Sequence, residues 1–202
     1  MVENTEIQIL RKIKKARRGA LFFADGFAGI ANGKAVNKAL ERLVKSGELT
    51  RMANGIYVRP VEDKILGMVL PDIEVVALAI AKRDKARIVP TGSQALYKLG
   101  LSTQIPMNVV YYTDGSPRKI RVGKQIITFK KASAKTLSAI GPISKLAIQA
   151  LRGTGKGKLN EDELDKIKNL LKKEKPFHLQ HDLKLAPVWI RGTLTENPKT
   201  KS

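Results

Sequence analysis

Apolar residues recur three and four positions apart at the start of the chain, a spacing that predicts an amphipathic helix. Ile7, Leu10 and Ile13 form this first stripe. Thr5-x-x-Gln8 has the form of a capping box, so we expect the helix to run from Thr5 to about Arg17, with Gly19 as its C′ residue. In the next segment, LFFADGFAG, Asp25 is a candidate N-cap for a short helix that ends near Gly29.

The strongest helical pattern lies at residues 34–46, where one stripe is apolar and the opposite face is polar. Asn32 is the expected N-cap and Gly47 the expected end. The apolar stripe consists of Val36, Ala39, Leu40, Leu43 and Val44. The polar face carries Lys34, Asn37, Lys38, Glu41, Arg42 and Lys45.

A β-hairpin is predicted directly after this helix by the stretch RMANGIYVRP. Residues 50–52 should pair with residues 56–58 across Asn54-Gly55, in a type I′ turn with positive φ at both central positions. Ile56 and Val58 are expected to share an inward face, while Tyr57 is left open between an outward and a packed position. Arg59 is left open between a phosphate contact and an interdomain salt bridge.

Helix, short helix, turn, amphipathic helix and hairpin follow in the order of a winged helix-turn-helix. The second helix of such a pair enters the major groove of DNA. Asn37 has the amide group that pairs with adenine, and Arg42 or the lysines suit guanine or phosphate. The competing interpretation of each single lysine is an ordinary solvated side chain.

The remainder of the chain predicts a mixed α/β domain followed by helices. Helices are expected over 72–82, where the segment is apolar nearly all round and so should be buried, and over 91–99. Strands are expected at 87–89, 107–113, 118–122 and 125–130, and further helices from Pro142 and over 160–173. The predicted fold class is therefore α+β, with a winged helix-turn-helix over 1–60, a C-terminal domain over 61–195 and a disordered tail over 196–202.

Charge directs attention to polyanionic partners. The chain has 38 Lys+Arg against 18 Asp+Glu, a net charge of +20. Residues 1–60 carry 12 basic and 5 acidic side chains, +7, and the remainder carries 26 and 13, +13. Such an excess fits nucleic acid. The absence of cysteine excludes disulfides and thiolate metal sites, and the lack of a signal peptide or long apolar run predicts a cytoplasmic protein without membrane contact.

Two stretches of the sequence, the first of which contains the helix and hairpin described above, resemble a known family. AVNKALERLVKSGELTRMANGIYVRP and VPTGSQALYKLGLSTQIPMNVVYYTDG are similar, in order and spacing, to the Abi-type (abortive infection) antitoxins of type IV toxin–antitoxin systems, and the resemblance covers roughly residues 4–131. It implies an antitoxin that represses its own promoter through promoter repeats and counteracts a nucleotidyltransferase-like toxin, without a stable complex. It assigns DNA-facing roles to Asn32, Lys34, Asn37, Lys38, Arg42 and Arg51, and no antitoxic role to any side chain.

Catalytic and metal-binding patterns are weak. RGTGKGKL lacks the spacing and the Ser or Thr of a phosphate-binding loop, and His178 and His181 are too few for zinc. Asp72 and Asp114 are better explained as a helix cap and a turn residue. We therefore expect no enzyme, cofactor or metal. Two alternatives to the DNA-binding antitoxin stay open: an adaptor that binds and masks a protein partner, and a general RNA-binding module.

Overall fold

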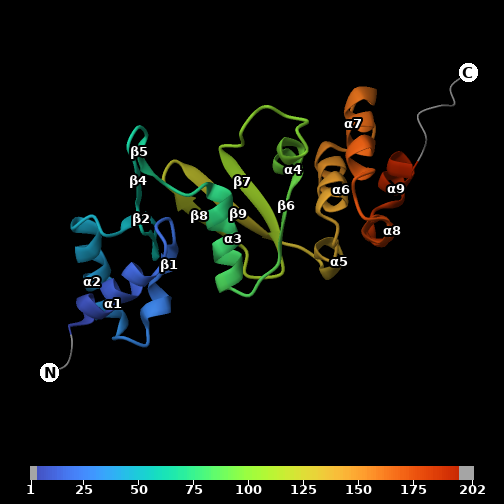
Figure 1. Ribbon diagram of the computed structural model, residues 1–202. Helices are drawn as coiled ribbons and strands as arrows, with labels where there is room; N and C mark the ends of the chain where they lie inside the picture. The colour runs from blue at the N-terminus through green and yellow to red at the C-terminus, as the bar shows by residue number, and fades with distance from the viewer. Residues whose placement is uncertain (1–3, 196–202) are drawn as a thin grey trace, which may run out of the picture. The chain divides into compact units, whose positions relative to one another are not determined.

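The computed structural model describes residues 4–195 and has a mixed α+β architecture (Figure 1). The chain divides into two compact units, which are described separately below. Unit 1 comprises Met1–Ala79 with Ile120–Lys124, and unit 2 comprises Ile80–Lys119 with Gln125–Ser202. The domain boundary drawn from the sequence at residue 60 stays a prediction, and the predicted tail at 196–202 lies outside the described residues.

Helix α1 (Thr5–Lys15) begins unit 1 and is capped differently from the sequence prediction. Asn4 is the N-cap, because its side-chain oxygen accepts the N–H of Glu6 at 3.0 Å. The Thr5-x-x-Gln8 capping box is therefore wrong. The helix also ends before Arg17, since the backbone at Ala16 is already extended.

The LFFADGFAG segment forms a strand and a 3₁₀ turn. Strand β1 (Leu21–Phe23) was not predicted, and η1 (Ala24–Phe27) follows it. The N-cap of η1 is Phe23, without a side-chain cap, so the assignment of Asp25 as N-cap is wrong. The short apolar run LFF was the available strand signal, but three residues are too few to reveal a period of two.

A three-stranded sheet in the order β1-β3-β2 contains the predicted hairpin, β2 (Thr50–Ala53) and β3 (Ile56–Val58). The register pairs Arg51 with Tyr57 and Ala53 with Ile56, with an irregularity between Arg51 and Ala53. Gly55 has φ +68°, whereas Asn54 keeps a negative φ. The expected type I′ turn is therefore wrong, because that turn needs positive φ at both residues.

The side chain of Tyr57 is packed and does not point outward, which resolves the two positions that the sequence left open. All three β3 residues are buried, and Tyr57 belongs to the core of unit 1 with Ile9, Ile13 and Phe27. Side chains alternate between the two faces of a strand, so the burial of Tyr57 together with Ile56 and Val58 shows that both faces of β3 are covered.

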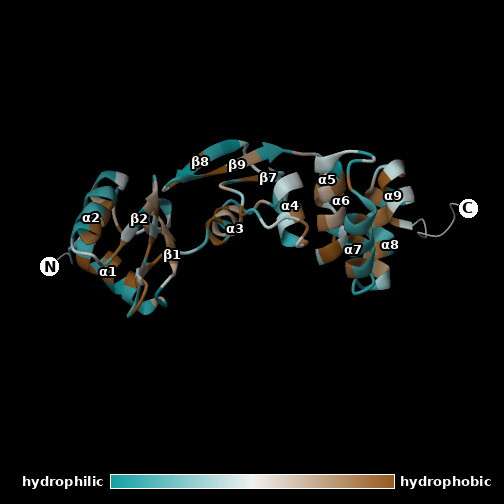
Figure 2. Cartoon of the chain, turned by 90° about the horizontal axis from the view of Figure 1, so that it is seen from above, coloured by the Kyte–Doolittle hydropathy of each residue, from teal (hydrophilic) through white to brown (hydrophobic). Residues whose placement is uncertain are grey.

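Helix α2 (Gly33–Lys45) supplies most of the remaining core of unit 1. Val36, Ala39, Leu40 and Leu43 are between 0% and 4% exposed, as the apolar stripe predicted. In Figure 2 both α1 and α2 carry hydrophobic and hydrophilic ribbon, which is the appearance of amphipathic helices.

A second hairpin, β4 (Val61–Asp63) and β5 (Gly67–Val69), follows and was not predicted from the sequence. Asp63 Oδ1 accepts the N–H groups of Ile65 and Leu66 at 2.8 and 2.9 Å, and these bonds lower the pKa of its carboxyl. Ile65 and Leu66 at the turn are 92% and 77% exposed.

Helix α3 (Ile73–Arg83) begins at the cap that the sequence predicted. Asp72 Oδ1 accepts the N–H of Glu74 at 2.7 Å. The expectation that the helix is buried all round is wrong, because Val75 and Leu78 are 49% and 50% exposed.

A four-stranded sheet has the order β6-β7-β9-β8, and three residues of β8 are grouped with unit 1. Strand β6 pairs antiparallel with β7, and β7 pairs parallel with β9. Helix α4 (Gly92–Lys98) lies between β6 and β7 in the chain. The strands are β6 (Ile88–Pro90), β7 (Asn108–Thr113), β8 (Arg118–Val122) and β9 (Gln125–Lys131).

Helix α6 (Pro142–Thr154) is the centre of the helical part of unit 2, with Pro142 in its first turn as predicted. It packs against α4, α7, α8 and α9. At the α4 contact the backbones of Gly92 and Gly153 meet so closely that a Cβ on Gly153 would overlap Gly92. The other helices are α5 (Ala134–Leu137), α7 (Glu161–Leu171), α8 (Pro176–Leu185) and α9 (Val188–Thr195).

The N-terminus of α6 is held by two buried carboxylates from a distant part of the chain. Asp182 accepts the N–H groups of Ile140 and Gly141 at 2.8 Å each and the hydroxyl of Ser144 at 2.6 Å. Glu174 accepts the N–H groups of Ile143 and Ser144 at 2.8 and 3.2 Å. Burial raises the pKa of both carboxyls, but these hydrogen bonds outweigh it and the pKa of each lies below its ordinary value.

Candidate nucleic-acid interface

Asn32 places the first turn of α2 by capping it. Its side-chain oxygen accepts the N–H of Ala35 at 2.9 Å. Because the oxygen is engaged in the cap, only the amide NH₂ of this exposed residue is available to a phosphate or a base. The oxygen of Asn32 therefore caps the helix, and its NH₂ group is the part that can contact a ligand.

The solvent face of α2 brings together the polar residues that the sequence grouped. Each of these polar residues is exposed, while the apolar stripe on the opposite face packs in the core of unit 1. Glu41 lies on the same exposed face and was not among the predicted contacts. The face comprises Lys34, Asn37, Lys38, Glu41, Arg42 and Lys45. Its net positive charge and its side-chain amide suit phosphate and base edges respectively.

Arg42 differs from the other residues of this face because it has a protein partner. Its Nη1 is 3.3 Å from Glu6 Oε2 on α1, and the two side chains are 55% and 30% exposed. The ion pair links the two helices and holds the guanidinium toward α1. A pair at this exposure is weak, so the guanidinium is still within reach of a polyanion.

Arg51 lies at the β2–β3 turn. Its Nη2 donates to Asn54 Oδ1 at 2.9 Å and its Nε donates to the Ala53 carbonyl at 3.4 Å. The exposed guanidinium is therefore fixed against the turn by Asn54. The Asn-Gly pair has a double role, since Gly55 makes the turn and Asn54 orients Arg51.

Arg59 has a structural contact that the sequence did not predict. Its Nη1 donates to the carbonyls of Lys14 and Ala16 at 3.1 and 2.5 Å, at the C-terminal end of α1. A guanidinium is favourable there because the last helical carbonyls lack backbone partners and carry the negative end of the helix dipole. Arg59 thus attaches the end of β3 to α1.

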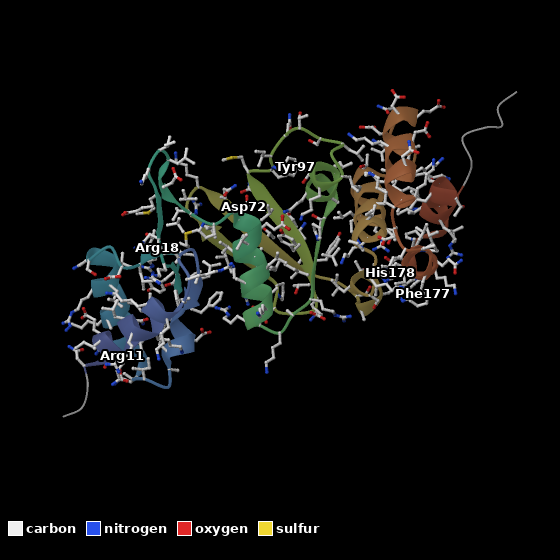
Figure 3. All side chains as sticks on the ribbon, viewed as in Figure 1. Arg11, Arg18, Asp72, Tyr97, Phe177 and His178 are labelled. Atoms are coloured by element: carbon white, nitrogen blue, oxygen red, sulfur yellow. The ribbon has the colours of Figure 1, made fainter. Side chains whose placement is uncertain are left out.

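Basic residues of α1 form a second positively charged surface that sequence reasoning did not assign. A hollow of about 270 Å³ is lined by Gln8, Arg11, Lys12, Lys15 and Ile30. Lys12 Nζ donates to the Gly26 carbonyl at 2.8 Å and lies 5.2 Å from the centre of the Phe27 ring. Arg11 is labelled on α1 in Figure 3. The run RKIKKARR was the signal for this surface.

In unit 2, the TDG motif has a structural role. Asp114 accepts the N–H and the Nε of Arg87 at 2.7 and 2.8 Å, and the hydrogen bonds from Arg87 hold the pKa of the Asp114 carboxyl below its ordinary value. Thr113 is buried, and its hydroxyl accepts the N–H of Gly115 at 3.0 Å. These contacts agree with the interpretation of Asp114 as a turn residue.

No group of side chains within residues 4–195 has the composition of a metal site. His178 and His181 lie on α8 beside the buried carboxylates, with Nδ1 atoms 3.5 Å from Glu174 and 2.8 Å from Asp182. Figure 3 labels His178 next to the exposed Phe177. Across the described part of the chain, no helix is long and apolar enough to cross a membrane.

Comparison with known proteins gives a family without an assigned function. The model of DUF6088, a family of unknown function, matches residues 8–179. The chain belongs to DUF6088. The match includes α2, both hairpins, the four-stranded sheet and α6, and ends within α8. The DUF6088 assignment thus covers the whole candidate interface.

No curated protein matches this DUF6088 chain. A solved structure, the crystal structure of RV2827C protein from Mycobacterium tuberculosis, aligns with 100% of this chain and 84% of that chain, at a TM-score of 0.48 and 11% sequence identity. A similarity at this level transfers no function.

Proposed function

We propose that unit 1 is a winged helix-turn-helix that binds double-stranded DNA, with α2 as the recognition helix and the β2–β3 turn as the wing. The observation that carries the proposal is the division of α2 into two faces. One face is buried in the core, and the other exposes Lys34, Asn37 and Lys38 directly after the Asn32 cap. Residues near the N-terminus of a recognition helix are those that contact base edges.

The proposed contacts divide by chemistry. Asn37 presents a side-chain amide, which can make paired hydrogen bonds to adenine. Lys34, Lys38, Lys45 and Arg51 present cations that suit phosphates, which position the protein without reading sequence. Arg42, paired with Glu6, adds positive charge to the same face.

The proposal is tested by replacing Lys34, Asn37 and Lys38 together with Ala and measuring binding to the DNA upstream of the protein's own reading frame by fluorescence anisotropy. Each lost base or phosphate contact should cost roughly 1 kcal/mol or more, so affinity should fall about 100-fold. The matched control replaces Asn169, Lys172 and Lys173, which are an asparagine and two lysines exposed at the end of α7. Equal losses in the two variants, with circular dichroism unchanged, would refute the assignment of α2.

For the whole chain we propose an autorepressing antitoxin of a type IV toxin–antitoxin system that opposes a nucleotidyltransferase-like toxin in the cytoplasm. The support is the resemblance of the two sequence stretches to Abi-type antitoxins, together with the DNA-binding geometry proposed for unit 1. Under this proposal the protein represses and antagonises without being an enzyme. Expression of a neighbouring nucleotidyltransferase-like reading frame should arrest growth, and co-expression of this chain should restore it. Continued arrest would refute the antitoxin role and leave the repressor role intact.

A second candidate function is an adaptor that binds a protein partner directly, and the β4–β5 hairpin favours it. The turn exposes Ile65 and Leu66, and Met68 on β5 is 54% exposed. Exposed apolar groups that lie together are typical of protein interaction sites. Co-purification of the neighbouring gene product that survives a high-salt wash, and is lost in Ile65→Ser/Leu66→Ser, would support this alternative over indirect antagonism.

A further inference from the structure

The segment RGTGKGKL, which lacks the pattern of a phosphate-binding loop, forms part of a pocket in unit 2. It connects the end of α6 to α7. Gly155 and Gly157 have φ of +98° and +72°, a conformation that favours glycine. The N–H of Gly155 donates to the Leu151 carbonyl at 2.8 Å and completes the last turn of α6, and the positive φ of Gly155 then redirects the chain.

The pocket has a volume of about 530 Å³, within the range of small-molecule sites. Its walls come from α6, the glycine loop, α7 and α9. The lining residues are Leu151, Gly155, Lys156, Gly157, Leu159, Leu164, Lys168, Trp189 and Thr193. Residues far apart in the sequence thus meet in one concave site.

One side of the pocket is apolar and rests on a well-packed cluster. Leu151 is buried, and Leu159, Leu164 and Trp189 pack against the cluster that it forms with Ile190. The Trp189 side chain is half-buried, so part of it supports the core while part lines the pocket. An aromatic surface of this kind is suited to a planar ring.

The rim of the pocket is positively charged. Lys156 is exposed on the loop, and Lys168 lines the pocket from α7. None of the lining residues is acidic. Two acidic residues of α7, Asp162 and Asp165, instead line a separate hollow together with Lys173. The field at the pocket therefore favours an anion, whereas the field at the other hollow is mixed.

We propose that this pocket binds a mononucleotide, with the base against Trp189 and the leucines and the phosphates at Lys156 and Lys168. Both halves of the ligand are needed to explain the lining, because free phosphate would not use the aromatic wall and an uncharged ring would not use the lysines. Base–aromatic stacking and charge-assisted hydrogen bonds from lysine to phosphate are the interactions involved. The site is separate from the DNA-binding face proposed for unit 1 and does not depend on it.

Trp189 allows a direct test because it is the chain's only tryptophan. The full chain is titrated with ATP, GTP, CTP and UTP separately at physiological salt, and the fluorescence of Trp189 is recorded. At least one nucleotide should change the fluorescence saturably. The corresponding nucleoside and inorganic pyrophosphate should each bind at least about tenfold more weakly, because each lacks one half of the recognised ligand.

Lys156→Glu should weaken nucleotide binding at least about tenfold, since a repulsive charge replaces a phosphate ligand on an exposed loop residue that no core contact requires. Lys173→Glu is the matched control, because it makes the same charge change just after the C-terminal end of α7, outside the pocket, and it should leave the affinity unchanged. Equal weakening by both variants would show attraction by net charge alone and would overturn the proposal. So would the lack of any saturable change up to millimolar nucleotide, or a response to a short oligoribonucleotide but to no mononucleotide.

Discussion

The role of an arginine in this protein is decided by its neighbours. Arg59 donates hydrogen bonds to the carbonyls at the end of α1, Arg51 is oriented by Asn54, and Arg42 is paired with Glu6. The sequence presents all three as basic residues near a helix or a hairpin. Only Arg42 and Arg51 keep an exposed guanidinium for a polyanion, and Arg42 must share it with a carboxylate.

At the residue scale, Glu6→Gln should tighten DNA binding roughly threefold. The change removes an acidic group from the proposed interface and releases Arg42 from an exposed ion pair, whose strength of about 0–1 kcal/mol sets the size of the effect. Fluorescence anisotropy with promoter DNA measures it.

Glu48→Gln is the control for this variant. It removes one negative charge from unit 1 and releases Lys14, 3.2 Å from the Glu48 carboxylate, without altering the face of α2. An equal gain in DNA affinity from both variants would show that the effect comes from net charge. A loss of affinity in Glu6→Gln would show that the ion pair positions Arg42 for binding.

At the scale of elements, α6 depends on residues far from its own sequence. Gly141 offers α6 no side-chain cap. Glu174, which lies between α7 and α8, accepts the first-turn N–H groups of Ile143 and Ser144, and Asp182 of α8 accepts the N–H groups of Ile140 and Gly141 just before the helix. Buried backbone groups at a helix end need such partners, and carboxylates also suit the positive end of the helix dipole. The cluster connects α6 and α8 by more than apolar contact.

The pH dependence of stability should reveal this cap. The pKa values of Asp182 and Glu174 are lowered in the folded state, so their contribution is fully present above the unfolded pKa, near 4, and is lost as pH falls toward the folded values. The free energy of unfolding should therefore decrease below about pH 4. Denaturant unfolding across this range measures it.

Asp182→Asn isolates the Asp182 contribution. It replaces one accepting oxygen by an NH₂ group facing backbone donors, so the free energy of unfolding at pH 7 should fall by about 2 kcal/mol. The decrease between pH 5 and pH 3 should also become smaller than in the unsubstituted protein. An unchanged pH profile would show that the carboxylate does not stabilise the fold. Asp165→Asn, an exposed change on α7, serves as the control.

At the scale of the whole molecule, the net charge of +20 is spread over both units, so charge alone does not identify the binding surface. The salt dependence of DNA binding can separate specific phosphate contacts from this general attraction. Five cations, Lys34, Lys38, Arg42, Lys45 and Arg51, lie on α2 and at the β2–β3 turn. If they supply the phosphate contacts, log K against log salt should have a slope of about −4.5.

The slope is measured by anisotropy at a series of salt concentrations. Lys130→Ala/Lys135→Ala, which removes two exposed cations of unit 2, should leave it unchanged, and Arg51→Ala should reduce its magnitude by about one. A steeper slope that falls with the Lys130 and Lys135 changes would extend the DNA contact to unit 2.

Helices with regular spacing and strong caps were predictable because their signals are local. The pattern at 34–46 gave α2 within one residue at each end, Pro142 began α6, and Asn160 caps α7. The chain-end helices α8 and α9 and strand β1 were missed. They are short, and α8 and β1 lack a clear apolar period. The residues of the candidate interface were named from the sequence and stay a prediction, whereas the protein partners of Arg42, Arg51 and Arg59 came only from the structure.

The sequence by itself determined the α+β composition, the amphipathic face of α2 and the concentration of basic side chains, because periodicity, caps and charge are properties of short segments. Only the tertiary structure decided what long-range contacts impose. It placed β3 between β1 and β2, packed Tyr57 into the core with Ile9 and Phe27, and brought the Arg59 guanidinium to the carbonyls at the end of α1. It also brought Glu174 and Asp182 to the start of α6. It also joined the glycine loop to Trp189 in one pocket. A polar group takes the partner that folding brings within reach, and that partner is often dozens of residues away in the chain.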